Sequence, residues 1–148
     1  MGLFDAVLGT ENQTQTVLNS AEAFAVIVLL ATASDGYLSV EQGNYITFAL
    51  SQMKLFKGYP HEMLNRLFDQ ILGILQGDGF NALFDAAKYS LSQDLRESAF
   101  AVATDLILAG GVAAEEEKSF LNDLYQALGV SSEIAVQIVE VMLIKNRG

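Results

Sequence analysis

The fold of this chain is decided by residues 24–42, which read FAVIVLLATASDGYLSVEQ. The apolar run that opens this stretch is about half the length of a membrane-spanning helix, and it predicts a helix that is buried on all sides. Asp35 and Gly36 then predict a turn that stops the helix. Ser39, followed three residues later by Gln42, is the pattern of a capping box that begins a second helix. The stretch therefore predicts a helix–turn–helix.

The same pattern returns in residues 98–116, which read SAFAVATDLILAGGVAAEE. Gly110 and Glu115 lie 74 residues after Gly36 and Glu41. In both copies the glycine supplies a turn, and the glutamate lies in the first turn of the next helix, where it complements the helix dipole. The match therefore extends beyond the apolar faces that any two amphipathic helices share. We expect the two stretches to be an internal repeat.

The rest of the chain carries apolar residues at spacings of three and four, which predicts further helices. The clearest of these stripes, which we expect to lie in the core, contains Leu64, Leu67, Phe68 and Ile71. Gly77 and Gly79 are expected to end that helix. The predicted helices span about residues 12–34, 39–53, 60–76, 80–91, 93–108, 115–128 and 132–144. We thus expect an all-α protein: a single compact domain of about seven helices over residues 1–148, with pseudo-symmetric halves at about residues 20–53 and 94–128.

The composition excludes several classes of function. The 148 residues include 18 acidic and 8 basic side chains, giving a net charge of −10. Such a chain repels phosphate backbones, and its basic residues are scattered, so we expect no nucleic-acid binding. The absence of cysteine excludes disulfides and thiolate chemistry, and a single histidine makes a zinc site or a histidine-dependent triad very difficult to build. Because we also find no secretion signal and no membrane span in the sequence, we expect a cytoplasmic protein.

Hydrophobic residues make up 51% of the chain, more than one small core readily hides. We therefore expect self-association, as a weak homodimer. The last predicted helix is the expected interface because it is apolar on more than one side. Its apolar residues are Ile134, Val136, Ile138, Val139, Val141, Leu143 and Ile144.

The two turns carry a family resemblance. The segments ASDGYLSVE (residues 33–41) and AGGVAAEE (residues 109–116) resemble the Ala-Asp-Gly-x-x-x-x-x-Glu turns of the TerB-like family. That family includes the tellurite-resistance protein TerB and the N-terminal region of a membrane-anchored DnaJ-type co-chaperone. The second copy continues into FLNDLYQALGV (residues 120–130), which is similar to the usual ending of the family. The resemblance covers about residues 20 to 130.

The resemblance implies an all-helical fold of about seven helices with pseudo-symmetric halves. It also implies acidic clusters that bind divalent cations, and a part in stress-response assemblies, including a membrane-associated stress-resistance complex. The chain departs from the family pattern at Ala109, where the second turn is expected to hold an aspartate, and Asp105 lies one turn earlier. This departure reduces the number of expected protein ligands.

The candidate metal ligands, four carboxylates at or near the two turns, are Asp35, Glu41, Asp105 and Glu115. Because they offer oxygen alone, the expected cation is Ca²⁺ or Mg²⁺, bound weakly. The competing interpretation is structural. Gly36 permits a left-handed turn, and the charge of Glu41 interacts favourably with the helix dipole.

The sequence leaves three hypotheses for the function. The first is a non-enzymatic interaction module for tellurite or stress resistance that binds protein partners and a divalent cation. The second is an enzyme that uses paired carboxylates, such as Asp35 with Asp105 or Glu115, as general acid and base. The third is a purely structural protein whose apolar surplus forms a dimer interface. We favour the first, because the sequence shows no catalytic constellation.

Overall fold

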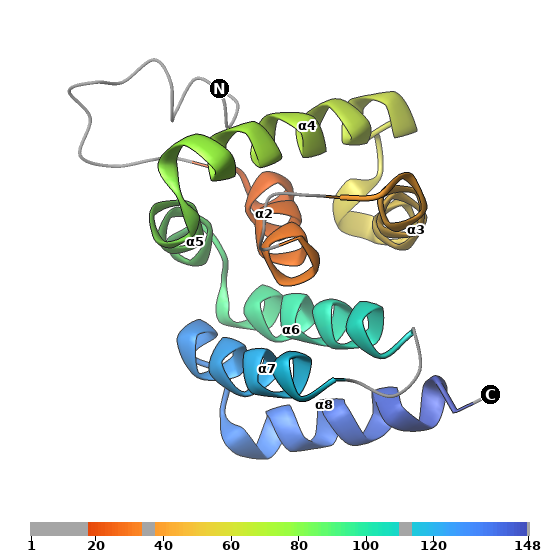
Figure 1. Cartoon of the computed structure of the whole chain (residues 1–148), viewed down its shortest axis with the longest axis vertical. Helices are drawn as coiled ribbons and strands as arrows, with labels where there is room; N and C mark the ends of the chain where they lie inside the picture. The colour runs from red at the N-terminus through yellow and green to blue at the C-terminus, as the bar shows by residue number, and fades with distance from the viewer. Residues whose placement is uncertain (1–17, 34–37, 110–113, 148) are drawn as a thin grey trace. The chain divides into compact units, whose positions relative to one another are not determined.

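The structure, a computed structural model, describes residues 18–33, 38–109 and 114–147. Every regular element within these ranges is a helix: seven α-helices and one short 3₁₀ turn (Figure 1). This confirms the predicted all-α fold class and the predicted number of helices. The chain divides into two compact units, Met1–Leu91 and Ser92–Gly148.

The N-terminal unit contains α2 (Ser20–Thr32), α3 (Val40–Ser51), η1 (Lys54–Phe56), α4 (His61–Asp78) and α5 (Phe80–Tyr89). The C-terminal unit contains α6 (Gln93–Leu108), α7 (Glu115–Leu128) and α8 (Ser132–Lys145). In the first unit α2 packs against α5, α4 and η1, and α3 packs mainly against α4 and η1. In the second unit α6 packs closely against both α7 and α8.

Helix α2 is buried along nearly its whole length, as the apolar run predicts. Every residue from Ala21 to Leu30 is buried, and the ring of Phe24 meets the ring of Phe56 edge-on at 6.0 Å. The helix begins later than predicted, because Asn19 caps it. The side chain of Asn19 accepts a hydrogen bond from the backbone N–H of Glu22 at 2.7 Å, and the side chain of Glu22 accepts one from the backbone N–H of Asn19 at 3.1 Å. Residues 12–17 lie outside the described residues.

The predicted stripe of the third helix lies in the core, on the inner face of α4. Its members Leu64, Leu67, Phe68 and Ile71 are all buried. The prediction that Gly77 ends this helix is wrong, because α4 continues through it to Asp78. Gly79, at a φ of +91°, ends the helix, since this backbone conformation is one that glycine adopts without strain.

The helix pairs that flank the two repeated turns have similar boundaries. When α2 and α3 are shifted by 74 residues, they nearly coincide with α6 and α7. Ser39 and Gln42 form the predicted capping box, with hydrogen bonds of 3.0 Å in each direction. Helices α6 and α7 begin and end as predicted. The Asp35-Gly36 and Gly110-Gly111 turns themselves lie outside the described residues. The two helix pairs differ in packing. Helices α6 and α7 pack directly against each other, whereas α3 packs mainly against α4 and η1 rather than against α2.

Candidate functional site

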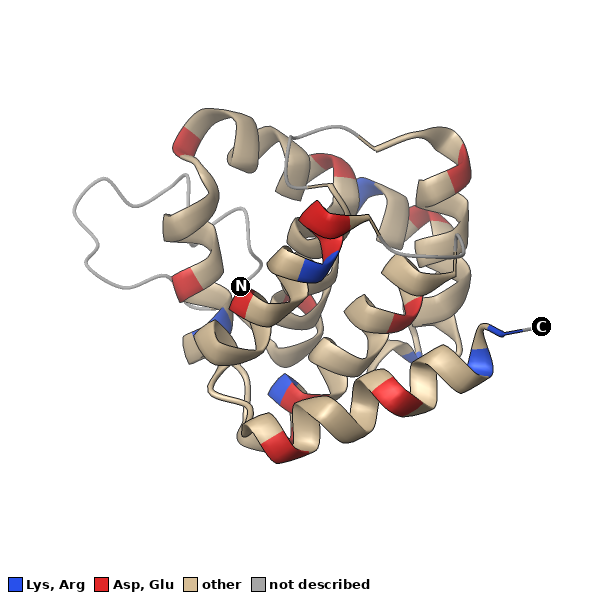
Figure 2. Ribbon diagram, turned by 60° about the horizontal axis from the view of Figure 1, so that its bottom comes forward, with Lys and Arg blue, Asp and Glu red and all other residues tan. Residues whose placement is uncertain are grey.

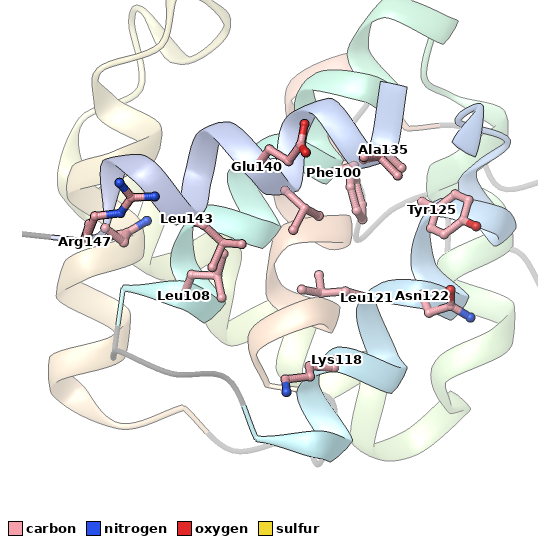
Figure 3. A pocket seen from close by; sticks show the side chains of 13 residues that line it. Phe100, Leu108, Lys118, Leu121, Asn122, Tyr125, Ala135, Glu140, Leu143 and Arg147 are labelled. Carbon is pink, nitrogen blue, oxygen red and sulfur yellow. The ribbon is translucent and has the colours of Figure 1, made fainter. Parts of the chain in front are cut away.

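The C-terminal unit carries an open groove of about 980 Å³ between α7 and α8 (Figure 3). The groove forms because α7 and α8 both pack on α6 but approach each other less closely. Its lining is mostly aliphatic and aromatic and includes Phe100, Leu108, Leu121, Tyr125, Val136, Val139 and Leu143. The charged residues of the lining are Lys118, Glu140 and Arg147. The groove therefore offers apolar surface with charges at a few positions.

Phe100 on α6 lies beneath this groove and is only 1% exposed. Its ring meets the ring of Tyr125 on α7 edge-on, with 6.1 Å between the ring centroids. Phe100, Thr104 and Leu108 are all buried, at a spacing of four residues. Our sequence analysis did not single out Phe100, although this spacing marks one face of a helix and is the signal that identifies it.

The connection between α7 and α8 is set by a glycine-ended cap. Gly129 adopts a left-handed conformation with a φ of 77°. Its N–H donates to the carbonyl of Gln126, and the N–H of Val130 donates to the carbonyl of Tyr125, which is the pattern of a Schellman motif. The side chain of Ser131 then accepts a hydrogen bond from the N–H of Ile134 at 3.2 Å and so caps α8. These contacts fix where α7 stops and α8 begins.

Asp105 fixes the other end of α8 against α6. Its carboxylate is 3.1 Å from the ammonium of Lys145 and accepts a hydrogen bond of 2.8 Å from the side-chain amide of Asn146. The same amide of Asn146 also donates to the backbone carbonyl of Met142 at 2.9 Å. Asp105, a candidate metal ligand from the sequence, is thus engaged with the end of α8 in this structure.

Helix α8 is apolar yet largely exposed. Ala135 is its one buried residue. The large apolar side chains that stay exposed are Val136 (56%), Val141 (57%), Leu143 (50%) and Ile144 (59%). The sequence predicted a last helix that is apolar on more than one side, and α8 presents this apolar surface to the groove and to the outside.

The remaining candidate metal ligands are Glu115, Glu41 and Asp35. Glu115 is the first residue of α7, and its carboxylate forms an exposed ion pair with the ammonium of Lys118 at 2.9 Å. Glu41 lies in the first turn of α3, in the N-terminal unit. Asp35 lies outside the described residues. Where the chain is described, no three histidine, aspartate or glutamate side chains gather in a way that holds a metal ion, so the cation site stays a prediction from the sequence.

None of the described helices is both long enough and apolar enough to cross a membrane. No family model, curated protein or solved structure matches this chain.

Proposed function

We propose that this chain is a non-enzymatic protein-interaction module whose interaction surface is the groove between α7 and α8. The observation that carries the proposal is an open apolar groove of about 980 Å³ bordered by exposed apolar residues of α8. Monomeric proteins rarely expose contiguous apolar surface of this kind, and where they do it commonly marks an interaction site. The groove is therefore best explained by a partner that covers it.

The shape of the groove indicates the kind of partner. Two helices flanking a third leave a channel that accepts an amphipathic helix, whose apolar side chains recur every three or four residues along one face. Val136 and Leu143 on one wall and Leu121 and Tyr125 on the other supply matching apolar surface. This lining suits the burial of apolar side chains better than the stabilisation of developing charge, which requires converging polar groups.

The biological setting in the proposal comes from the TerB-like resemblance. We place the module in the cytoplasm, in a stress-response assembly that contributes to tellurite resistance and contacts a membrane-associated complex through protein partners. A weak Ca²⁺ or Mg²⁺ site at the acidic turns is part of the same proposal, and it is supported by the repeat of glycine and glutamate in the sequence.

Site-specific photo-crosslinking in the organism that encodes the chain tests the interaction surface. A photoreactive amino acid replaces Val136, which lines the groove, or in the matched control Gln137, which is exposed next to it but does not line the groove. We expect one discrete crosslinked product from position 136 during tellurite challenge and little from position 137. Leu143→Lys should abolish the product, because it places a charge in the apolar wall.

Growth under tellurite tests the setting. A strain that carries Leu143→Lys should be as sensitive to tellurite as a strain that lacks the protein, while the Gln137→Lys strain grows like the wild type. If position 136 gives the crosslinked product but the Leu143→Lys strain tolerates tellurite as well as the wild type does, the result supports the interaction surface and refutes the role in resistance. Equal crosslinking at positions 136 and 137 would refute the interaction surface itself.

A further inference from the structure

One face of α8, continued by Arg147 just past the end of the helix, combines exposed apolar residues with charges of both signs. Val136, Glu140, Leu143 and Arg147 follow one another at spacings of four, three and four residues, and all four line the groove. Within α8 this spacing places Val136, Glu140 and Leu143 on one side of the helix, and Arg147, two residues past the end of the helix at Lys145, continues the lining of the groove. Val136 and Leu143 are 56% and 50% exposed, so this face, which we call the α8 stripe, has large apolar side chains without cover.

The two charges of the α8 stripe have no partner within the described part of the chain. The side chains of Glu140 and Arg147 make no ion pair or hydrogen bond there, in contrast to the neighbouring Lys145, which pairs with Asp105. Figure 2 shows that acidic residues occupy the earlier turns of the helix that leads to the C-terminus, and that basic residues follow at its end. The charge therefore changes sign along α8.

We propose that the groove is occupied by the C-terminal end of α8 and the following Arg147 of a second copy of this chain, which run antiparallel to the first α8 across a twofold axis. This inference rests on the proposed function and names its partner. In an antiparallel pair Leu143 lies near the axis, and Glu140 comes next to Arg147 of the second copy. The twofold axis also brings Arg147 of the first copy next to Glu140 of the second, because an isologous interface makes every contact twice.

Charge complementarity favours a second copy as the occupant of the groove, and it favours the antiparallel over the parallel direction. A parallel pair would bring Glu140 next to Glu140 and Arg147 next to Arg147, which is repulsive, whereas the antiparallel pair joins opposite charges. The net charge of −10 opposes association with a second copy, whereas the α8 stripe carries charges of both signs. Polar contacts of this kind set register and direction, and the apolar residues supply most of the affinity.

Sedimentation equilibrium with charge-reversed full-length chains tests the proposal. Glu140→Arg and Arg147→Glu each place like charges opposite one another in both symmetry-related contacts, so each should raise the dimer dissociation constant about tenfold or more. An equimolar mixture of the two variants should form a heterodimer close to wild-type affinity, because both of its contacts again join opposite charges. The double variant Glu140→Arg/Arg147→Glu should recover affinity for the same reason.

Glu133→Arg is the matched control, since Glu133 is an exposed acidic residue of the same helix that does not line the groove. It should leave the dissociation constant within about twofold of the wild type. Circular dichroism of each variant checks that the helices are intact, which we expect because Glu140 and Arg147 are both exposed.

Two results would overturn the inference. If the wild-type chain stays monomeric at the highest attainable concentration, no second copy occupies the groove. If the single reversals weaken association but the mixture fails to restore it, the antiparallel pairing is wrong. The proposed function fails separately, when position 136 gives no crosslinked product of any mass. If position 136 crosslinks to a different protein and the chain is a monomer in sedimentation, the proposed function is supported and this inference is wrong.

Discussion

Helices α2 and α8 have similar apolar character and opposite environments. Both carry apolar residues on all sides, yet every residue from Ala21 to Leu30 of α2 is buried, whereas Ala135 is the one buried residue of α8. Around α2 lie α5, α4 and η1, while α8 rests on α6 beside an open groove. The comparison teaches that an apolar pattern predicts a need for cover without saying which molecule provides it. For α8 we infer that a second copy provides it.

The largest expected effect is on the buried helix. Phe24→Ala should lower the free energy of unfolding by about 3–5 kcal/mol, because it removes a fully buried ring that contacts Phe56 and leaves a cavity. Ile144→Ala on α8, at 59% exposure, should change it by less than about 0.5 kcal/mol in dilute protein. Urea denaturation measures both. Equal losses for the two variants would show that the burial of α2 and α8 does not differ as described.

A change in association is the next largest effect. Leu143→Lys should make the chain monomeric, since each copy loses about 0.8–1.5 kcal/mol from burial of the exposed half of the leucine and gains a charge at the interface. The unfolding of dilute monomer should hardly change, because Leu143 is half exposed. Light scattering over a concentration series measures the mass, with Gln137→Lys as the control. Dimer formation by Leu143→Lys at wild-type concentrations would place the interface elsewhere.

A smaller effect is expected where α8 is fixed to α6. Asp105→Ala removes the ion pair with Lys145 and the hydrogen bond from Asn146, and it should lower the free energy of unfolding by about 1–2 kcal/mol. The ion pair contributes only part of this, because the side chain of Lys145 is 54% exposed. Thermal or urea unfolding measures the loss, with the exposed Asp123→Ala as the control. An unchanged Asp105→Ala chain would show that these contacts do not hold α8.

The smallest expected effect concerns the acidic turns that follow α2 and precede α7. Millimolar Ca²⁺ or Mg²⁺ should raise the melting temperature slightly, because a weakly bound ion stabilises the folded state only when its concentration exceeds its dissociation constant. The Asp35→Asn/Glu41→Gln double variant should lose this response. A wild-type chain that does not respond, or a double variant that responds equally, leaves these residues as turn and dipole residues alone.

The sequence predicted the helices well because their signals are local. Ser39 with Gln42 identified the start of α3, Gly129 identified the end of α7, and the stripe around Phe68 identified the inner face of α4. The errors arose where a local signal competed with another. Gly77 is tolerated inside α4, and Asn19 begins α2 later than its apolar pattern suggests.

The groove was not predicted, because it depends on how closely α7 and α8 approach each other after both have packed on α6. Such long-range packing leaves no local pattern in the sequence. The sequence shows the apolar surplus of α8, but it does not show that these side chains stay exposed in the folded chain. Asp105 illustrates the same limit, since its contacts with Lys145 and Asn146 join residues about 40 positions apart.

Amide hydrogen exchange across a range of protein concentrations compares the two helices in one measurement. We expect the amides of α2 to exchange slowly at every concentration, because the helix is buried within the chain. The amides around Glu140 to Ile144 of α8 should exchange faster in dilute protein and slow down as the concentration passes the dimer dissociation constant. Exchange in α8 that does not change with concentration, while α2 stays protected, would contradict the claim that a second copy covers α8.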